Sequence, residues 1–153
     1  MRFILVDKII ELEPGKNIKA VKTLPSTEEF FQDHFPSFPV VPGVLLTEMM
    51  AQAAGKCLDA ERKPRGKAML VRIKSAGFHN WVPPDQEVII HAEIKNNQDR
   101  YATAECRIET ENKTVCKAEL FFGFLSYDHF APDYRDEILE TYLAAKKEGA
   151  GIQ

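Results

Sequence analysis

Residues 34–62, HFPSFPVVPGVLLTEMMAQAAGKCLDAER, join a proline-rich loop directly to a long apolar segment. Residues 44–62 are helix-forming residues without a proline, so we expect a helix of about seventeen residues there, roughly 25 Å long. Apolar side chains occupy nearly every side of this helix. Because a helix that is apolar all round must be buried, the segment predicts a central helix that the rest of the chain surrounds.

The segments around this helix alternate apolar and polar residues, which is the pattern of half-buried strands. In residues 87–97, for example, Val88, Ile90, Ala92 and Ile94 share one face. The expected strands are residues 1–12 (a short strand and turn), 16–24, 67–78, 87–97, 100–110 and 113–125, with hairpin turns at 97–99 and 111–112. Such strands pack most simply as a curved antiparallel sheet wrapped around the helix, an α+β fold.

A second helix is predicted near the C-terminus, at residues 133–148. Its apolar stripe comprises Ile138, Leu139, Tyr142 and Leu143. We expect this helix to cover a sheet edge or to pack on a neighbouring protomer, because its stripe is too short for a membrane anchor. The chain is therefore divided into a main domain at residues 1–130 and a C-terminal helical extension at 131–153.

Composition and charge exclude several classes of protein. The chain has 153 residues, 44% of them apolar, which suits one domain with a sizeable core, and its net charge of −3 gives no electrostatic case for nucleic acid. No apolar run approaches the roughly eighteen residues needed to span a bilayer, and Asp7 and Lys8 interrupt any signal peptide. We interpret Cys57, Cys106 and Cys116 as small buried hydrophobes in a reducing cytoplasm, without the spacing of a metal site.

Glu48 is the polar residue that does not fit this apolar helix, and Gln52 lies one turn further on the same face. A carboxyl group that is buried without a partner tends to stay protonated, and a neutral carboxylic acid can donate a proton. On this interpretation Glu48 is a catalytic acid. On the alternative interpretation, its side chain reaches solvent at a sheet edge or a subunit contact.

The loop before the helix holds a single histidine, His34, among prolines at every third position from Pro36. Prolines restrict the backbone, so the loop is expected to be a stiff, nearly extended ribbon that Phe35 and Phe38 anchor on the core. A histidine held in one orientation is suited to accept and return protons near neutral pH. The alternative is a proline-rich turn whose histidine has only a structural role.

Gly43 stands where the loop becomes the helix. The first backbone N–H groups of a helix, here those of Gly43 and Val44, have no intrahelical partner and carry the positive end of the helix dipole. A glycine lets a substrate carbonyl approach these groups closely, so the helix start can serve as an oxyanion hole. His34, Gly43 and Glu48 together provide a base, N–H donors and an acid for the removal of an α-proton and a β-hydroxyl.

These residues carry a resemblance to a known family. Residues 34–55, HFPSFPVVPGVLLTEMMAQAAG, closely resemble the signature of the β-hydroxyacyl-acyl carrier protein dehydratases of fatty-acid synthesis, HFPGxPVxPGVLxxEAxAQ, with the same spacing from histidine to glutamate. Residues 77–88, GFHNWVPPDQEV, resemble that family's second block, FRxPVxPGDxL. Ser37, His79, Trp81 and Pro84 depart from the two patterns, so the chain is expected to be a divergent member.

The resemblance implies a hot-dog fold, in which a sheet wraps around one helix. It also implies a homodimer, possibly a hexamer built as a trimer of dimers, whose active site takes its histidine from one chain and its acidic residue from the other. By position, His34 matches the catalytic histidine, Glu48 the catalytic carboxyl, Gly43 the residue whose amide binds the thioester carbonyl, and Gln52 the glutamine that supports the glutamate.

The expected function is elimination of water from a 3-hydroxyacyl thioester, carried on acyl carrier protein or coenzyme A, to give a trans-2-enoyl thioester without cofactor or metal. The acyl chain is expected between helix and sheet, in a channel lined by Phe38, Met49 and Met50. Two alternatives stay open: a hot-dog acyl thioesterase, and a non-catalytic subunit that binds acyl carriers. Free thiol release without an enoyl product would favour the thioesterase.

Overall fold

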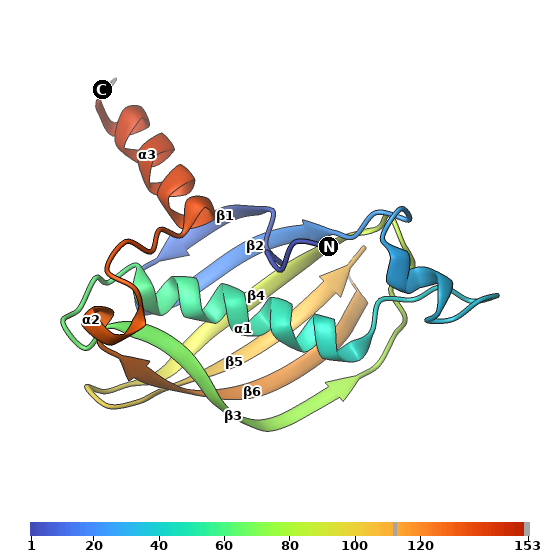
Figure 1. Ribbon diagram of the computed structural model, residues 1–153, viewed down its shortest axis with the longest axis horizontal. Helices are drawn as coiled ribbons and strands as arrows, with labels where there is room; N and C mark the ends of the chain where they lie inside the picture. The colour runs from blue at the N-terminus through green and yellow to red at the C-terminus, as the bar shows by residue number, and fades with distance from the viewer. Residues whose placement is uncertain (112, 152–153) are drawn as a thin grey trace.

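The structure is a computed structural model that describes residues 1–111 and 113–151. One curved antiparallel sheet wraps around helix α1 (Gly43–Asp59), and two helices, α2 (Tyr127–Phe130) and α3 (Glu137–Gly151), follow the last strand (Figure 1). The strands found in the described residues are β1 (Lys8–Glu13), β2 (Asn17–Thr23), β3 (Lys67–Phe78), β4 (Glu87–Asn97), β5 (Ala102–Thr110) and β6 (Lys113–Leu125). The predicted α+β architecture with an extra C-terminal helix is confirmed.

The strand order is β1-β2-β4-β5-β6-β3, so β1 and β3 form the two edges of the sheet. In the middle of the sheet, Ile90 of β4 lies opposite Ala20 of β2 and Ile108 of β5. These three side chains are fully buried on the face that packs against α1, as the alternation of apolar and polar residues predicted. The central helix therefore lies across the sheet's concave apolar face (Figure 1).

Helix α1 is buried along most of its length. Its side chains in the core include Leu46, Met49, Met50, Ala53, Ala54, Cys57 and Leu58. Cys57, Cys106 and Cys116 are all buried and unpaired with one another, and burial raises the pKa of each thiol to about 12, so these thiols stay protonated. The interpretation of the cysteines as small buried hydrophobes is confirmed.

Most predicted elements are observed with small shifts at their ends. The predicted bounds of β3, β4 and β6 are observed unchanged, and α1 ends at Asp59, a few residues before the predicted end. Two short elements were not predicted, namely α2 and a 3-10 helix, η1 (Glu29–Gln32), in the proline-rich connection. The predicted turn at 111–112 includes Asn112, which lies outside the described residues.

Helix α3 begins at Glu137, later than predicted, because Asp136 caps its N-terminus. The carboxylate of Asp136 accepts a hydrogen bond from the Leu139 N–H in the first turn, at 3.1 Å. Leu139 is buried in the core, and Ile138 packs against it. Only the first turns of α3 reach the sheet, beside β1, and the rest of the helix projects from the body (Figure 1). None of the helices within the described ranges has the length and apolar composition needed to cross a membrane.

Candidate active site

The hydrogen bonds of His34 fix which ring nitrogen is available for chemistry. Its backbone N–H donates to the Phe30 carbonyl at 2.9 Å, and its carbonyl accepts from the Val40 N–H at 3.0 Å. The ring Nδ1 lies 3.1 Å from the Val40 carbonyl oxygen. Because a carbonyl oxygen only accepts hydrogen bonds, Nδ1 carries the proton of the neutral ring and Nε2 carries the lone pair. The loop thus presents His34 as a base at Nε2.

The prediction that Phe35 and Phe38 anchor this loop on the core is wrong for the protomer, because their side chains are 51% and 54% exposed. Phe31 of η1 and Val41 are the buried anchors. They fill the core on both sides of the loop, so the intervening segment projects beyond the end of the sheet (Figure 1). Phe35 instead stacks on the His34 ring, with 4.1 Å between ring centroids.

The first turn of α1 has amide groups available for a ligand. The carbonyl of Pro42 accepts the third and fourth N–H groups of this region, at 2.9 and 3.2 Å. Within the described residues, this leaves the N–H groups of Gly43 and Val44 without an acceptor. A Cβ at Gly43 would lie 3.1 Å from the Phe78 ring, so the position has little room for any side chain. A glycine therefore fits this position, and binding of a substrate carbonyl by its amide stays a prediction.

Glu48 is half-buried and held by Gln52. The Leu5 N–H donates to Gln52 Oε1 at 2.8 Å, which fixes the orientation of the side-chain amide. Gln52 Nε2 therefore faces the Phe3 carbonyl at 3.2 Å and Glu48 Oε1 at 3.3 Å. The glutamine ties the N-terminal segment to the glutamate, so the pair expected from the helix spacing is observed.

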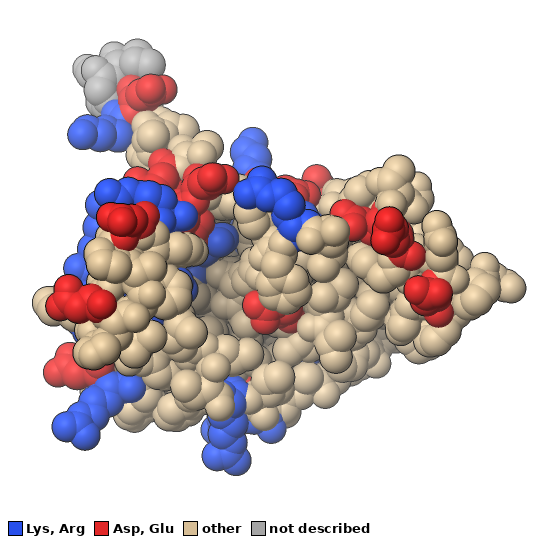
Figure 2. Space-filling model, in the orientation of Figure 1, with Lys and Arg blue, Asp and Glu red and all other residues tan. Residues whose placement is uncertain are grey.

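Glu48 opens onto a groove of about 490 Å³, which we call the Glu48 groove, between α1 and β3. Its walls include Gly55 of α1, Leu70 of β3 and, at one end, Tyr134 from the segment between α2 and α3. Figure 2 shows this face of the molecule hollowed between the helix and the C-terminal extension. Among the described residues of one protomer, His34 does not line this groove. A single chain therefore presents the histidine and the glutamate on separate surfaces.

The three acyl-channel candidates do not line the Glu48 groove in the protomer either. Met49 and Met50 lie fully buried in the core. Phe38 lies at the exposed tip of the loop, where its ring meets the edge of Trp81 at 6.4 Å between centroids. The apolar lining of the groove comes instead from the N-terminal segment, α1, β3, β6 and the C-terminal extension, and includes Phe3, Ile4, Ala51, Ala68, Met69, Leu70, Phe122, Phe130 and Ile138.

Sequence reasoning missed two ion pairs at the far end of α1. Lys56 Nζ lies 2.9 Å from Asp136, and Lys67 Nζ lies 2.8 Å from Asp59. Burial raises the pKa of the Asp59 carboxyl, an effect that the charge of Lys67 and the N–H of Ala68 oppose. Like Glu48, Lys56 is a charged residue in an apolar helix, which indicates that its side chain has a partner. That partner, Asp136, is too distant in sequence to be inferred.

The outer face of the sheet carries a larger hollow, of about 710 Å³, which offers no comparable chemistry. Its walls are mainly charged side chains, among them Lys19, Arg107 and Lys117, and it lacks an apolar wall for an acyl chain. His91, on the polar face of its strand as predicted, pairs there with Glu109 at 2.8 Å, which lowers the pKa of that carboxyl. No group of three or more potential metal ligands was found among the residues that the structure describes.

Comparison with known proteins identifies the family of the chain. Residues 1–119 match the family model described as a FabA-like domain. The 3-hydroxyacyl-[acyl-carrier-protein] dehydratase FabZ of Listeria monocytogenes serotype 4b is 36% identical over 122 residues, which cover 79% of this chain and 85% of the relative. The FabZ of Lactobacillus helveticus is 40% identical over 120 residues, covering 78% and 81% of the two chains.

Solved structures show the same fold at lower identity. The dehydratase heterocomplex ApeI:P from Xenorhabdus doucetiae superposes with a TM-score of 0.65 at 15% identity, over 84% of this chain and 87% of that one. A mutant of the fluoroacetyl-CoA-specific thioesterase FlK gives 0.63 at 12% identity, over 79% and 93%. These likenesses confirm the hot-dog fold and, at such identities, favour neither activity. The match over residues 1–119 and the FabZ relatives show that the chain belongs to the FabA-like family, that of the hot-dog 3-hydroxyacyl-[acyl-carrier-protein] dehydratases.

Proposed function

We propose that this chain is a 3-hydroxyacyl thioester dehydratase, which eliminates water to give a trans-2-enoyl thioester in fatty-acid or related lipid synthesis. The observation that carries the proposal is the hydrogen bond of His34 Nδ1 to the Val40 carbonyl, which leaves Nε2 as a base. The base stands in the same short run as the Gly43 amide and Glu48. The relatives named 3-hydroxyacyl-[acyl-carrier-protein] dehydratases support the substrate class.

Each group has one role in the reaction. His34 Nε2 removes the proton from the carbon next to the thioester carbonyl, and the electron pair moves toward the carbonyl oxygen. The N–H groups of Gly43 and Val44 bind that oxygen, and one such donor typically lowers the barrier by about 3–4 kcal/mol. Glu48, oriented by Gln52, protonates the departing β-hydroxyl. Water leaves, and a proton returns from His34 to the glutamate to reset the site.

The proposed active form is a homodimer, the unit from which a hexamer of three dimers would be built. β3 is an edge strand whose apolar side chains, including Val71, Ile73 and Phe78, are exposed. A long apolar edge strand is a template for pairing with another chain. We propose that two copies pair along β3, so that the loop with His34 and Phe38 of one copy reaches the Glu48 groove of the other.

The proposed substrate carrier is acyl carrier protein, which the names of the curated relatives print for those enzymes, with coenzyme A as the alternative. The proposed location is the cytoplasm, and the three buried, unpaired cysteines support it, since such thiols persist in reducing compartments. The proposed acyl channel is the Glu48 groove, with Met49 and Met50 in the core behind it and Phe38 contributed by the second copy.

The experiment follows enoyl thioester formation and thiol release in parallel, on wild type, His34→Ala and Glu48→Gln. Each substitution removes a proton-transfer group, so kcat should fall by about 100-fold to 10,000-fold while the fold is retained. His91→Ala is the matched control, because His91 lies on the outer face of the sheet, where it pairs with Glu109. Unchanged turnover in both site variants would refute the assignment. Thiol release without enoyl product would identify a thioesterase, and neither product from wild type would identify a binding subunit.

A further inference from the structure

The Glu48 groove runs along one face of α1, from Glu48 toward the Asp59 end of the helix. The residues of α1 that line it include Glu48, Ala51, Gly55 and Lys56, which recur at the spacing of one helix face. From Glu48 to Lys56 the helix rises about 12 Å. The small side chains at 51 and 55 leave room beside the helix, and the Cβ of an alanine at 55 would meet only Lys67 Nζ, at 3.9 Å. This stretch can hold an apolar chain that starts at Glu48.

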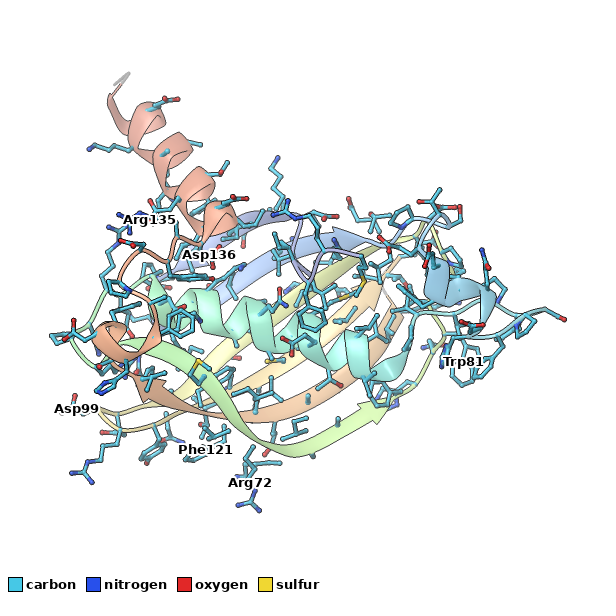
Figure 3. The ribbon with its side chains drawn as sticks, in the orientation of Figure 1. Arg72, Trp81, Asp99, Phe121, Arg135 and Asp136 are labelled. Carbon is cyan, nitrogen blue, oxygen red and sulfur yellow. The ribbon has the colours of Figure 1, made fainter. Side chains whose placement is uncertain are left out.

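The end of the groove is built by residues that the family model does not cover. We call residues 127–139, which comprise α2, the following loop and the start of α3, the cap segment; the matched region ends at residue 119. Phe130, Tyr134 and Ile138 of the cap segment line the groove. The rings of Phe130 and Tyr134 pack edge to face, 5.0 Å apart. Figure 3 shows Arg135 and Asp136 beside the base of α3, next to the far end of α1.

A buried ion pair fastens the cap segment to α1. Lys56 and Asp136 meet at 2.9 Å with side chains only 9% and 10% exposed. The second carboxylate oxygen of Asp136 accepts the Leu139 N–H at the start of α3. One carboxylate thus holds the helix start and the groove end together. Breaking such a pair inside a protein leaves a buried charge, so an acyl chain cannot displace it without a large penalty.

We propose that the cap segment closes the acyl groove and limits the substrate to short and medium acyl chains, with Phe130 and Tyr134 as specificity-determining residues and Asp136 as a positioning residue. The inference rests on the proposed function. A saturated chain gains free energy from the apolar stretch beside Ala51 and Gly55. A longer chain would have to enter a region where both buried lysines are already paired, Lys56 with Asp136 and Lys67 with Asp59. Further methylene groups would have to displace the packed rings of Phe130 and Tyr134, and neither lysine is free to bind a terminal carboxylate.

The test measures kcat/KM for 3-hydroxybutanoyl, 3-hydroxyoctanoyl and 3-hydroxyhexadecanoyl thioesters of acyl carrier protein. Wild type should favour octanoyl over hexadecanoyl by about tenfold or more, as expected when a pocket cannot accommodate added methylenes. Phe130→Ala and Tyr134→Ala should raise the hexadecanoyl-to-butanoyl ratio by about tenfold, through KM more than kcat. Gly55→Leu should act in the opposite direction and lower the octanoyl-to-butanoyl ratio, because its side chain enters the groove.

The positioning role of Asp136 is tested with a matched pair of variants. Asp136→Asn weakens the ion pair at the groove, and Glu140→Gln weakens the exposed pair between Glu140 of α3 and Arg62, which lies 3.3 Å away outside the groove. Only Asp136→Asn should change the chain-length ratio. Equal kcat/KM of wild type for all three chains, or folded Phe130 and Tyr134 variants with unchanged ratios, would overturn this inference and leave the dehydratase in place. Absence of dehydration with every chain would instead overturn the proposed function.

Discussion

The Gly43 end of α1 exposes apolar side chains, whereas the Asp59 end buries charged ones. Near Gly43, Val44 is 75% exposed and Trp81 is 71% exposed, and the first amides have no acceptor within the described residues. Near Asp59, Lys56 is paired with Asp136, and both side chains are almost fully buried. Figure 3 shows Trp81 and Asp136 at opposite ends of the molecule. Exposed apolar surface is costly, and buried charge is costly unless it is paired. The Gly43 end therefore needs a partner that covers its apolar side chains, and the Asp59 end needs a counter-charge for each buried charge.

The two ends of α1 differ in where their partner comes from. The Asp59 end is completed by the chain's own C-terminal extension, because Asp136 and Leu139 lie within the same chain. The Gly43 end has no such partner in the described part of the chain, and we have proposed that a second copy supplies it. On these proposals, one helix carries a closed end that sets substrate length and an open end where the active site is assembled between protomers.

The largest expected effect comes from mixing two inactive variants. If the site is shared, a mixed dimer of His34→Ala and Glu48→Gln contains one intact site and one doubly impaired site. Purified mixed dimers, isolated with two different tags, should regain about half of wild-type turnover. Each variant alone should be lower than wild type by about 100-fold to 10,000-fold.

Mixed dimers that stay as inactive as either variant would show that the two residues act within one chain. The control adds Ile73→Lys to both chains. Ile73 lies on the open edge strand β3 and is 50% exposed, so a lysine there should disfavour pairing and abolish the recovery.

The closed end should respond to loss of a charge with a drop in stability. Lys56→Ala and Asp136→Ala each leave the other charge buried without a partner, so the free energy of unfolding should fall by about 3–5 kcal/mol. Urea denaturation measures the change. Glu140→Ala, which breaks the exposed pair with Arg62, should cost less than about 1 kcal/mol. A similar small loss for all three variants would show that the Lys56–Asp136 pair is not sealed from solvent.

The smallest expected effect is a change in stability with pH, which tests whether the Asp59 end of α1 excludes water. Burial raises the pKa of Cys57, the neighbour of Lys56, to about 12, whereas an unfolded thiol titrates at about 8.5. Because the folded pKa is the higher one, the stabilisation is fully present below the unfolded pKa and is lost as pH rises toward the folded value. From about pH 7.5 to about pH 9.5 this thiol should lower the free energy of unfolding by about 1 kcal/mol. Cys57→Ala should reduce that decline in urea titrations, and an identical decline would contradict burial of the thiol.

Local patterns predicted most of the fold because strands and helices leave periodic signals. The alternation in residues 87–97 placed β4 with its observed bounds, and the apolar run after Gly43 placed α1. The short elements η1 and α2 were missed, because elements of only a few residues are too short to show a periodic pattern of apolar residues. The direction of Phe35 was missed for a related reason: its exposure depends on how much of the core Phe31 and Val41 already fill.

For the candidate site, the resemblance already implied that His34 and Glu48 come from different chains, and the structure places them on separate surfaces of one protomer. The spacing of His34, Gly43, Glu48 and Gln52 pointed to the chemistry, and the helix period placed Gln52 against Glu48, as observed. The pairing of Lys56 with Asp136 bridges positions far apart in the chain, so no local period could reveal it. The cap segment's place at the groove was inaccessible for the same reason.

By itself, the sequence determined the class of fold and the family, because these depend on residue type and on spacing along one chain. The set of reactive groups that it indicated stays a prediction. The tertiary structure decided which surfaces those groups occupy. It placed His34 outside the Glu48 groove of its own protomer, and it placed the C-terminal extension at the groove's far end. Such placements depend on how segments that are distant in sequence pack in the limited space around α1. Packing of that kind produces no periodic pattern in the local sequence.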